Sequence, residues 1–213
     1  MISFVQKNIA CCSNPNVVSL PSATTAGNLL MVSGAKLSQP ATTITSVSGG
    51  GVTTWLQAKR SNSFGDLEVW YGVVAAGSST AITVTFSTST GLNEAIVTEF
   101  STSIPGTWTL DQSAVNTSSA SPLSSGSITT AVATELVYAS AMRNGWSTTA
   151  ASGFTSLTTT SDFTQAAYLI VSSTGTYSTS WTYPSGNAEG LIVSFYVAPL
   201  SRGINSITTV GCQ

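Results

Sequence analysis

Two carboxylates, Asp66 and Glu68, stand one residue apart in the apolar segment FGDLEVWYGVV and are the residue pair with the clearest potential for chemistry. Residues two positions apart in a strand point to the same face, so these carboxylates could lie side by side. Paired carboxylates supply the acid and the base or nucleophile of glycoside hydrolysis. The alternative interpretation, which we favour, is a pair of solvated charges at the edge of a sheet.

Other acid–base chemistry is poorly supplied, because the chain has no histidine. This absence excludes a Ser-His triad and an imidazole metal site. Glu94 and Glu189 occupy matching positions in two similar segments, described below, and we expect them to do the same structural work twice. For example, both glutamates could accept backbone hydrogen bonds at the start of a strand. We therefore expect a protein that is not an enzyme and needs no cofactor.

Three cysteines remain: Cys11, Cys12 and Cys212. Adjacent cysteines do not easily pair with each other, but a bridge from Cys11 or Cys12 to Cys212 would tie the two termini together or link two subunits. Free buried thiols are the alternative. A metal site is a weaker interpretation, because the CxxC spacing and a fourth ligand are missing.

Two tryptophans lie in segments with the character of loops, Trp108 in IPGTWTL and Trp146 in RNGWSTT. Exposed aromatic rings stack on sugars, so these two residues are candidates for ligand or subunit contact. Packing in the interior is the alternative for both. Trp55, Trp70 and Trp181 lie in predicted strands, and we expect them in the core.

The composition narrows the class of protein. Only 7% of the 213 residues are charged, against about 25% in ordinary globular proteins, while 42% are hydrophobic. Threonine, which is abundant, suits an extended backbone, and surfaces rich in threonine and serine are common on extracellular and virion proteins. A net charge of −2 with six basic residues argues against a nucleic-acid partner.

Membrane and export signals are also missing from the sequence. No segment reaches the ~18 apolar residues that a membrane helix needs. The first residues, MISFVQKNIACC, carry Lys7 inside a short apolar run and do not resemble a signal peptide. We therefore expect a protein with no membrane contact that is not exported by the usual route, although its composition is typical of extracellular proteins.

Two parts of the chain repeat the same order of apolar segments. TTAGNLLMVSGA, from Thr24, matches TTAVATELVYASA, from Thr129, with Leu29 over Leu136. FGDLEVWYGVV (64–74) then falls over FTQAAYLIVSS (163–173), and Phe86, Gly91, Glu94 and Phe100 fall over Trp181, Gly186, Glu189 and Phe195. Because the order is kept and only loop lengths differ, residues 24–101 and 129–198 indicate an internal duplication.

The segments of each repeat have the pattern of strands. In ITVTF, Ile82, Val84 and Phe86 alternate with threonines, as in a strand with one buried face. EAIVTEF and EGLIVSFYV are more continuously apolar, which predicts central strands. SGGG (48–51) and PSGN (184–187) are typical of turns, and no segment has a convincing helical period.

We expect one all-β domain over residues 1–213, a single jelly-roll-like β-sandwich of ten or more strands. Neither repeat has enough strands to cover its own apolar face, so the two should stack on each other. Residues 107–127 would link them. Residues 1–20 and 199–213 would be terminal extensions used in subunit contacts, and INSITTV in the second could add a strand to this chain or to a neighbour.

A duplicated sandwich with few charges, many threonines and serines and no histidine loosely resembles bacteriophage virion proteins of the capsid-decoration and fibre type. The resemblance implies a non-enzymatic structural protein, made in the host cytoplasm without a signal peptide and exposed outside the cell after release. It implies partners that are copies of the chain itself, by analogy as a trimer, and a capsid or tail protein. Alternatives are a carbohydrate-binding or adhesive surface module, which would bind glycans, and a subunit of an extracellular filament.

Overall fold

The computed structural model describes residues 1–37, 41–75, 79–89, 91–143, 150 and 153–200. This part of the chain forms strands and turns without an α-helix, and its strands pair antiparallel in several sheets. The predicted all-β, sandwich-like architecture is confirmed. The segment GNLLMVSGA, whose length alone would also allow a helix, contains the strand β3 (Leu29–Lys36).

The first half of the chain forms two facing sheets. The larger sheet has the order β1 (Ile2–Cys11), β8 (Asn93–Thr102), β3, β6 (Asp66–Val73) and β5 (Leu56–Ser61). The smaller sheet has the order β2 (Asn16–Ser19), β7 (Ala81–Phe86) and β4 (Ile44–Gly49). Both sheets contribute to one hydrophobic cluster, in which Leu30, Val32 and Val97 of the larger sheet join Ile82 and Val84 of the smaller one.

The second half has a matching plan. Its larger sheet has the order β9 (Gly106–Ser118), β17 (Ala188–Pro199), β12 (Glu135–Arg143), β14 (Thr164–Val171) and β13 (Thr155–Ser156). Two short ribbons cover it, β10 (Leu123–Ser124) with β16 (Ser180–Trp181), and β11 (Ile128–Thr129) with β15 (Thr176–Tyr177). Trp181 and Ile128 of these ribbons pack against Val137 and Ile192 of the sheet.

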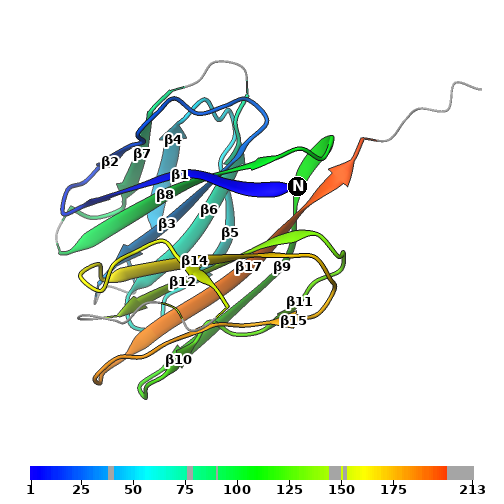
Figure 1. Cartoon of the computed structure of the whole chain (residues 1–213). Coiled ribbons are helices and arrows are strands. Elements are labelled where there is room, and N and C mark those ends of the chain that lie inside the picture. Colours follow the sequence, from blue (N-terminus) through cyan, green and yellow to red (C-terminus); the bar gives the residue numbers. More distant parts are fainter. Residues whose placement is uncertain (38–40, 76–78, 90, 144–149, 151–152, 201–213) are drawn as a thin grey trace, which may run out of the picture.

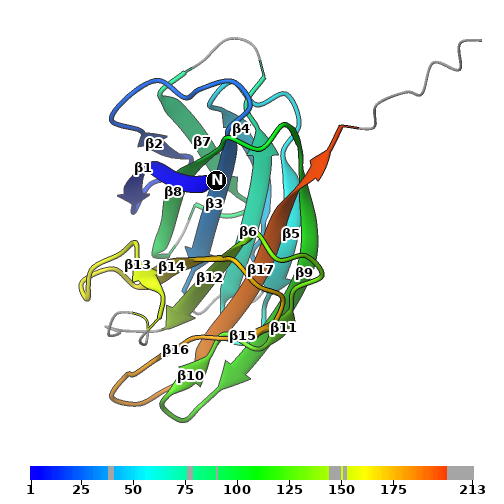
Figure 2. The same cartoon turned by 45° about the vertical axis from the view of Figure 1, so that its right-hand side comes forward.

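The two larger sheets pack face to face (Figures 1 and 2). Their shared cluster joins Leu29 and Phe100 of the first half to Leu136 and Phe195 of the second. The rings of Tyr71 and Phe195 meet edge-on across it, with centroids 4.8 Å apart. Each half therefore has an interior of its own as well as the shared one. Each half covers one face of its larger sheet with a smaller sheet or ribbons, and the opposite half covers the other face, which agrees with the expected stacking of the two repeats.

The strand ladders show which residues of the two halves occupy matching positions. Leu29 lies opposite Phe100 in the first half, as Leu136 lies opposite Phe195 in the second. The register shifts near this point in both edge ladders, after Phe4 in β1 and next to Phe195 in the pairing of β17 with β9. The alignment of β3 with β12 and of β8 with β17 predicted from sequence agrees with these ladders.

The ladders correct two other predictions. Tyr71 lies opposite Met31 and Tyr168 lies opposite Tyr138, so β6 and β14 align two residues away from the alignment of 64–74 with 163–173. A shift of two keeps every side chain on its face, so apolar alternation cannot detect it. The predicted linker 107–127 contains all but the first residue of β9, a 13-residue edge strand whose largely half-exposed side chains hide its strand pattern.

Candidate functional site

Asp66 and Glu68 lie on the face of β6 that is turned toward the smaller sheet, on the same side as Trp70. Both carboxylates have no exposed surface. The interpretation as solvated edge charges is therefore wrong, although the prediction that both share one strand face is consistent with the alternation of β6. Strand β5 covers the outer edge of β6 and removes it from solvent.

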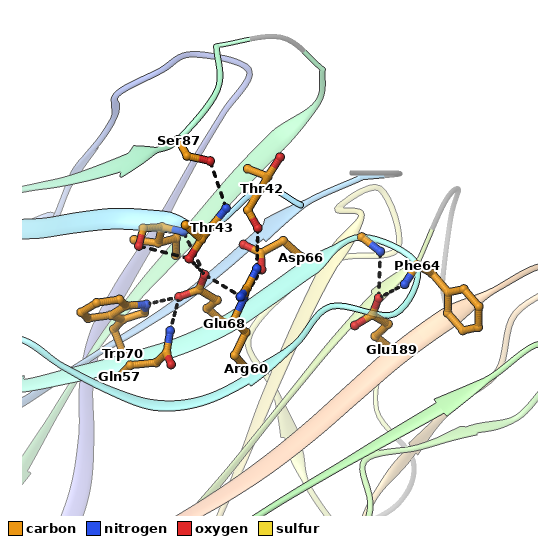
Figure 3. Close-up of polar contacts among 12 residues, drawn as sticks. Thr42, Thr43, Gln57, Arg60, Phe64, Asp66, Glu68, Trp70, Ser87 and Glu189 are labelled. Carbon is orange, nitrogen blue, oxygen red and sulfur yellow. Dashed lines mark hydrogen bonds and ion pairs between the residues drawn. The ribbon is translucent and has the colours of Figure 1, made fainter. Parts of the chain in front are cut away.

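Four donors converge on Glu68 (Figure 3). The Thr43 hydroxyl and the Ile44 backbone N–H donate to its Oε1 at 2.7 and 2.9 Å. Gln57 Nε2 and Trp70 Nε1 donate to its Oε2, each at 2.6 Å. Since Ile44 begins β4, an edge strand of the smaller sheet, this one carboxylate joins the two sheets of the first half.

Arg60 holds the second carboxylate. Its Nε donates to Asp66 Oδ1 at 2.7 Å and lies 3.4 Å from Glu68 Oε1, while its Nη2 donates to the Thr42 carbonyl at 2.7 Å (Figure 3). Burial, followed by the neighbouring charge of Glu68, raises the pKa of Asp66 to about 8 in spite of Arg60. Asp66 therefore keeps its proton to a higher pH than an ordinary aspartate.

Lys36 is the second cation on this face of the sheet. It lies opposite Asp66 in the ladder of β3 and β6, and its side chain is fully buried. Its Nζ donates to the Thr88 carbonyl at 2.9 Å and lies 5.8 Å from the centre of the Phe86 ring. Burial lowers the pKa of Lys36, as expected for an ammonium group removed from water.

This cluster suits a structural role better than hydrolysis. A glycosidase needs its two carboxyl groups on either side of a bound sugar, whereas Asp66 and Glu68 are enclosed by protein. Both oxygens of Glu68 are already occupied by donors. A buried carboxylate with this many donors is a strong link between the elements that supply them.

The second half places a neutral amide at the position of Glu68. Gln165 lies opposite Ala141 as Glu68 lies opposite Gly34, and it is also fully buried. Its Nε2 donates to the carbonyls of Thr159 and Asp162 at 2.9 and 2.8 Å, and its Oε1 accepts from Thr158 at 2.8 Å. The position thus connects strand and loop in both halves, with or without a charge.

Glu94 and Glu189 connect the halves reciprocally. Glu94 Oε2 accepts from the Thr164 backbone N–H at 2.7 Å, at the start of β14 in the other half. Glu189 Oε1 accepts from the backbone N–H groups of Phe64 and, at 2.8 Å, Gly65, just before β6 (Figure 3). The prediction that both accept backbone hydrogen bonds at a strand start is confirmed.

The hydroxyls of Ser33 and Ser140 hydrogen-bond to each other between the two larger sheets. These serines occupy matching positions of β3 and β12, four residues after Leu29 and Leu136. Contact between matching residues, together with the crossed glutamate bonds, is the pattern of a two-fold related interface. The sequence match of Glu94 with Glu189 signalled equivalence but gave no sign that their bonds cross.

Of the two candidate tryptophans, the structure describes one. Trp108 lies in β9 instead of a loop, is 5% exposed and belongs to the shared cluster. Its Nε1 donates to the Gly27 carbonyl at 3.1 Å. Its indole face is therefore not open to a sugar, and its contact is with the other half of the same chain. Trp146 lies outside the described residues.

Comparison with known proteins adds no relative. No protein-family model, curated protein or solved structure matches this chain. Within the described residues, no group of three or more His, Cys, Asp or Glu side chains could hold a metal ion. The same part of the chain contains no helix that is long and apolar enough to cross a membrane.

Cys11 and Cys12 are exposed at the end of β1, while Cys212 lies outside the described residues. The interpretation as buried thiols is therefore wrong for the first two, and their pairing with Cys212 stays a prediction. A hydrogen bond with Cys12, then burial and nearby negative charge, raise the pKa of Cys11 to about 11. Its thiolate, the reactive form, is therefore scarce at neutral pH.

We expect Cys11 to react with iodoacetamide at pH 8 about tenfold or more slowly than an ordinary exposed cysteine, because fewer thiolates are present. Cys12→Ala removes the first cause of the raised pKa and should accelerate alkylation of Cys11. Peptide mass spectrometry over a time course measures both rates. Equal rates of Cys11 alkylation in the two proteins would show that Cys12 does not control this thiol.

Sequence reasoning missed the donors of the Glu68 cluster. Thr43 and Gln57 come from a loop and a neighbouring strand, and neither has a distinctive pattern around it. The role of Arg60 could have been predicted. A basic residue in one strand and acidic residues in the next strand along the chain suggest an ion pair across the two strands. Arg60 does lie opposite Glu68 in the ladder.

Proposed function

We propose that the chain is a non-enzymatic structural protein of a virus particle, a capsid-decoration or other virion surface protein that assembles with itself and with a capsid or tail lattice. The observation that carries this proposal is the use of the buried carboxylates Glu68, Glu94, Glu99 and Glu189. Glu99, for example, accepts from the Thr25 backbone N–H and from Asn28. Each of the four joins separate segments of the fold.

The strand order of the first half supports the proposal. If its strands are numbered along the chain, the order 1-8-3-6 faces the order 2-7-4, which is the arrangement of a jelly roll with its fifth strand moved beside the sixth. The second half repeats the larger of these sheets as β9-β17-β12-β14-β13. Two jelly-roll-like halves derived from one duplicated unit fit these orders, and jelly rolls are used in viral capsids and in lectins.

The proposed duplication also explains the reciprocal contacts between the halves. A symmetric dimer buries the same surface on both partners, so each contact occurs twice with the roles exchanged. Glu94 and Glu189 show this exchange. Fusion of two such partners into one chain would fix the pairing permanently, which suits a component that must persist outside the cell.

Native mass spectrometry and electron microscopy of the purified chain test the assembly role. The proposal predicts a closed homo-oligomer with cyclic symmetry at micromolar concentration, with a trimer as the first expectation. Deletion of residues 199–213 should shift it to folded monomers if this segment makes subunit contacts. A protein that stays monomeric, and that binds specific sugars on a glycan array, would instead support the carbohydrate-binding module.

A further inference from the structure

An open apolar groove of about 530 Å³ lies at one end of the interface between the two halves. Met1, Ile2 and Ile104 of the first half line it together with Thr134, Ile170 and Val171 of the second. Ile2 belongs to the cluster that the two halves share, so the groove continues their interface to the surface. Its volume lies within the range of about 300–1,000 Å³ that is usual for ligand pockets.

The strand ladders identify the matching place at the opposite end of the interface. Ile2 lies opposite Thr102, two residues beyond Phe100. Trp108 lies opposite Val197, two residues beyond Phe195. Because Phe100 and Phe195 match, Trp108 is the counterpart of Ile2.

The surroundings of these two residues correspond as well. Gly27 precedes Leu29 by two residues, as Thr134 precedes Leu136. Val73 lies opposite Leu29, as Ile170 lies opposite Leu136. Thr134 and Ile170, which line the groove, therefore occupy the side that matches the Gly27 side of the Trp108 contact.

The counterpart of the groove is filled by an indole. Trp108 is 5% exposed there, and its Nε1 donates to the Gly27 carbonyl. The smaller Ile2 leaves the corresponding space open. The filled end thus shows which chemical group fits this surface, namely a flat aromatic ring that carries one hydrogen-bond donor.

We propose that the groove is a binding site for the tryptophan side chain of a partner polypeptide, with its indole N–H directed at the backbone carbonyl of Thr134. The symmetry of the interface indicates this occupant, because at its other end the matching space is filled by Trp108, a residue of the extended strand β9. A tryptophan ring buries enough apolar surface to anchor an interface, and its donor sets the orientation. This inference does not depend on the proposed virion role.

Methyl NMR of isoleucine-labelled protein tests the site directly, since Ile2, Ile104 and Ile170 all line the groove. The probe is the blocked peptide PGTWTLD, which has the sequence of residues 105–111, and its control has alanine in place of tryptophan. The tryptophan peptide should shift these three methyl signals saturably, with no effect on Ile82 in the core of the first half. The alanine peptide should leave all of them in place.

Three variants decide whether the shifts report the groove. Ile2→Trp should fill the space and abolish binding. Thr134→Lys, at an exposed position, should weaken binding at least tenfold. Trp108→Ala should open the counterpart and create a second site for the same peptide. Binding that survives in both groove variants would overturn the proposal, as would a wild-type protein that binds no peptide at millimolar concentration.

Discussion

Replacing Glu68 with alanine will lower the free energy of unfolding by about 3–5 kcal/mol, the usual cost of breaking a buried charged pair. The substitution removes the acceptor of the Thr43 hydroxyl, the Ile44 N–H and the Trp70 indole N–H. Unpaired buried donors each keep their desolvation cost. Urea denaturation followed by circular dichroism and tryptophan fluorescence measures the loss.

Two further variants distinguish the effect of losing a single hydrogen bond, or only the charge, from the effect of losing the whole Glu68 carboxylate. Gln57→Ala removes one donor from the exposed side and should cost less than about 1 kcal/mol, since its partner keeps other donors. Glu68→Gln keeps one carbonyl oxygen and should fall between the two. A Glu68→Ala protein that loses under about 1 kcal/mol would show that this cluster does not hold the two sheets of the first half together.

Raising the pH from 5 to 8 will destabilise the protein, in contrast to the usual behaviour of paired carboxylates. Burial raises the pKa of Glu94 from 4.5 to about 7 and that of Asp66 from 3.8 to about 8. Between its ordinary pKa and its raised pKa, each carboxyl group keeps a proton in the folded protein that it releases in the unfolded chain. The free energy of unfolding therefore falls as the pH rises through this range. Since one pKa unit corresponds to about 1.4 kcal/mol and most of the Glu94 shift is traversed between pH 5 and 8, Glu94 alone should remove about 2.5 kcal/mol.

The variant Glu94→Gln isolates the contribution of this residue. Glutamine keeps an acceptor for the Thr164 N–H without a titratable group, so the dependence on pH should become shallower. At pH 8 the variant should be more stable than the wild type, while near pH 4 the two should agree. Thermal unfolding at several pH values measures this, and a wild-type melting temperature that rises between pH 5 and 8 would contradict the assignment.

The strands that bury one or both faces could be predicted from sequence. The alternation of ITVTF places Ile82, Val84 and Phe86 in the core, with the threonines between them half exposed. The continuous apolar segments became β8 and β17, which lie inside their sheets and are covered on both faces. Such patterns succeed because the burial of apolar surface supplies most of the driving force for folding and follows strand periodicity.

The burial of Asp66 and Glu68 could not be predicted in the same way. The local sequence of β6 is the same whether a charged side chain in it faces water or a set of buried hydrogen-bond donors. Apart from Trp70 of β6 itself, the donors come from β5, from the start of β4 and from the loop before it, so the burial depends largely on tertiary contacts that no local pattern encodes. The strand β9 was missed for a related reason, because an edge strand with half-exposed side chains lacks clear alternation.

Hydrogen exchange in increasing urea, read by mass spectrometry, tests most directly whether the two halves form one folding unit. Amides in β3 and β12 lie in the two sheets that share the central cluster. If the two halves unfold as one cooperative unit, peptides from both strands will lose protection at the same urea concentration and with the same slope. Protection that disappears from one strand while the other remains protected would contradict a shared unit.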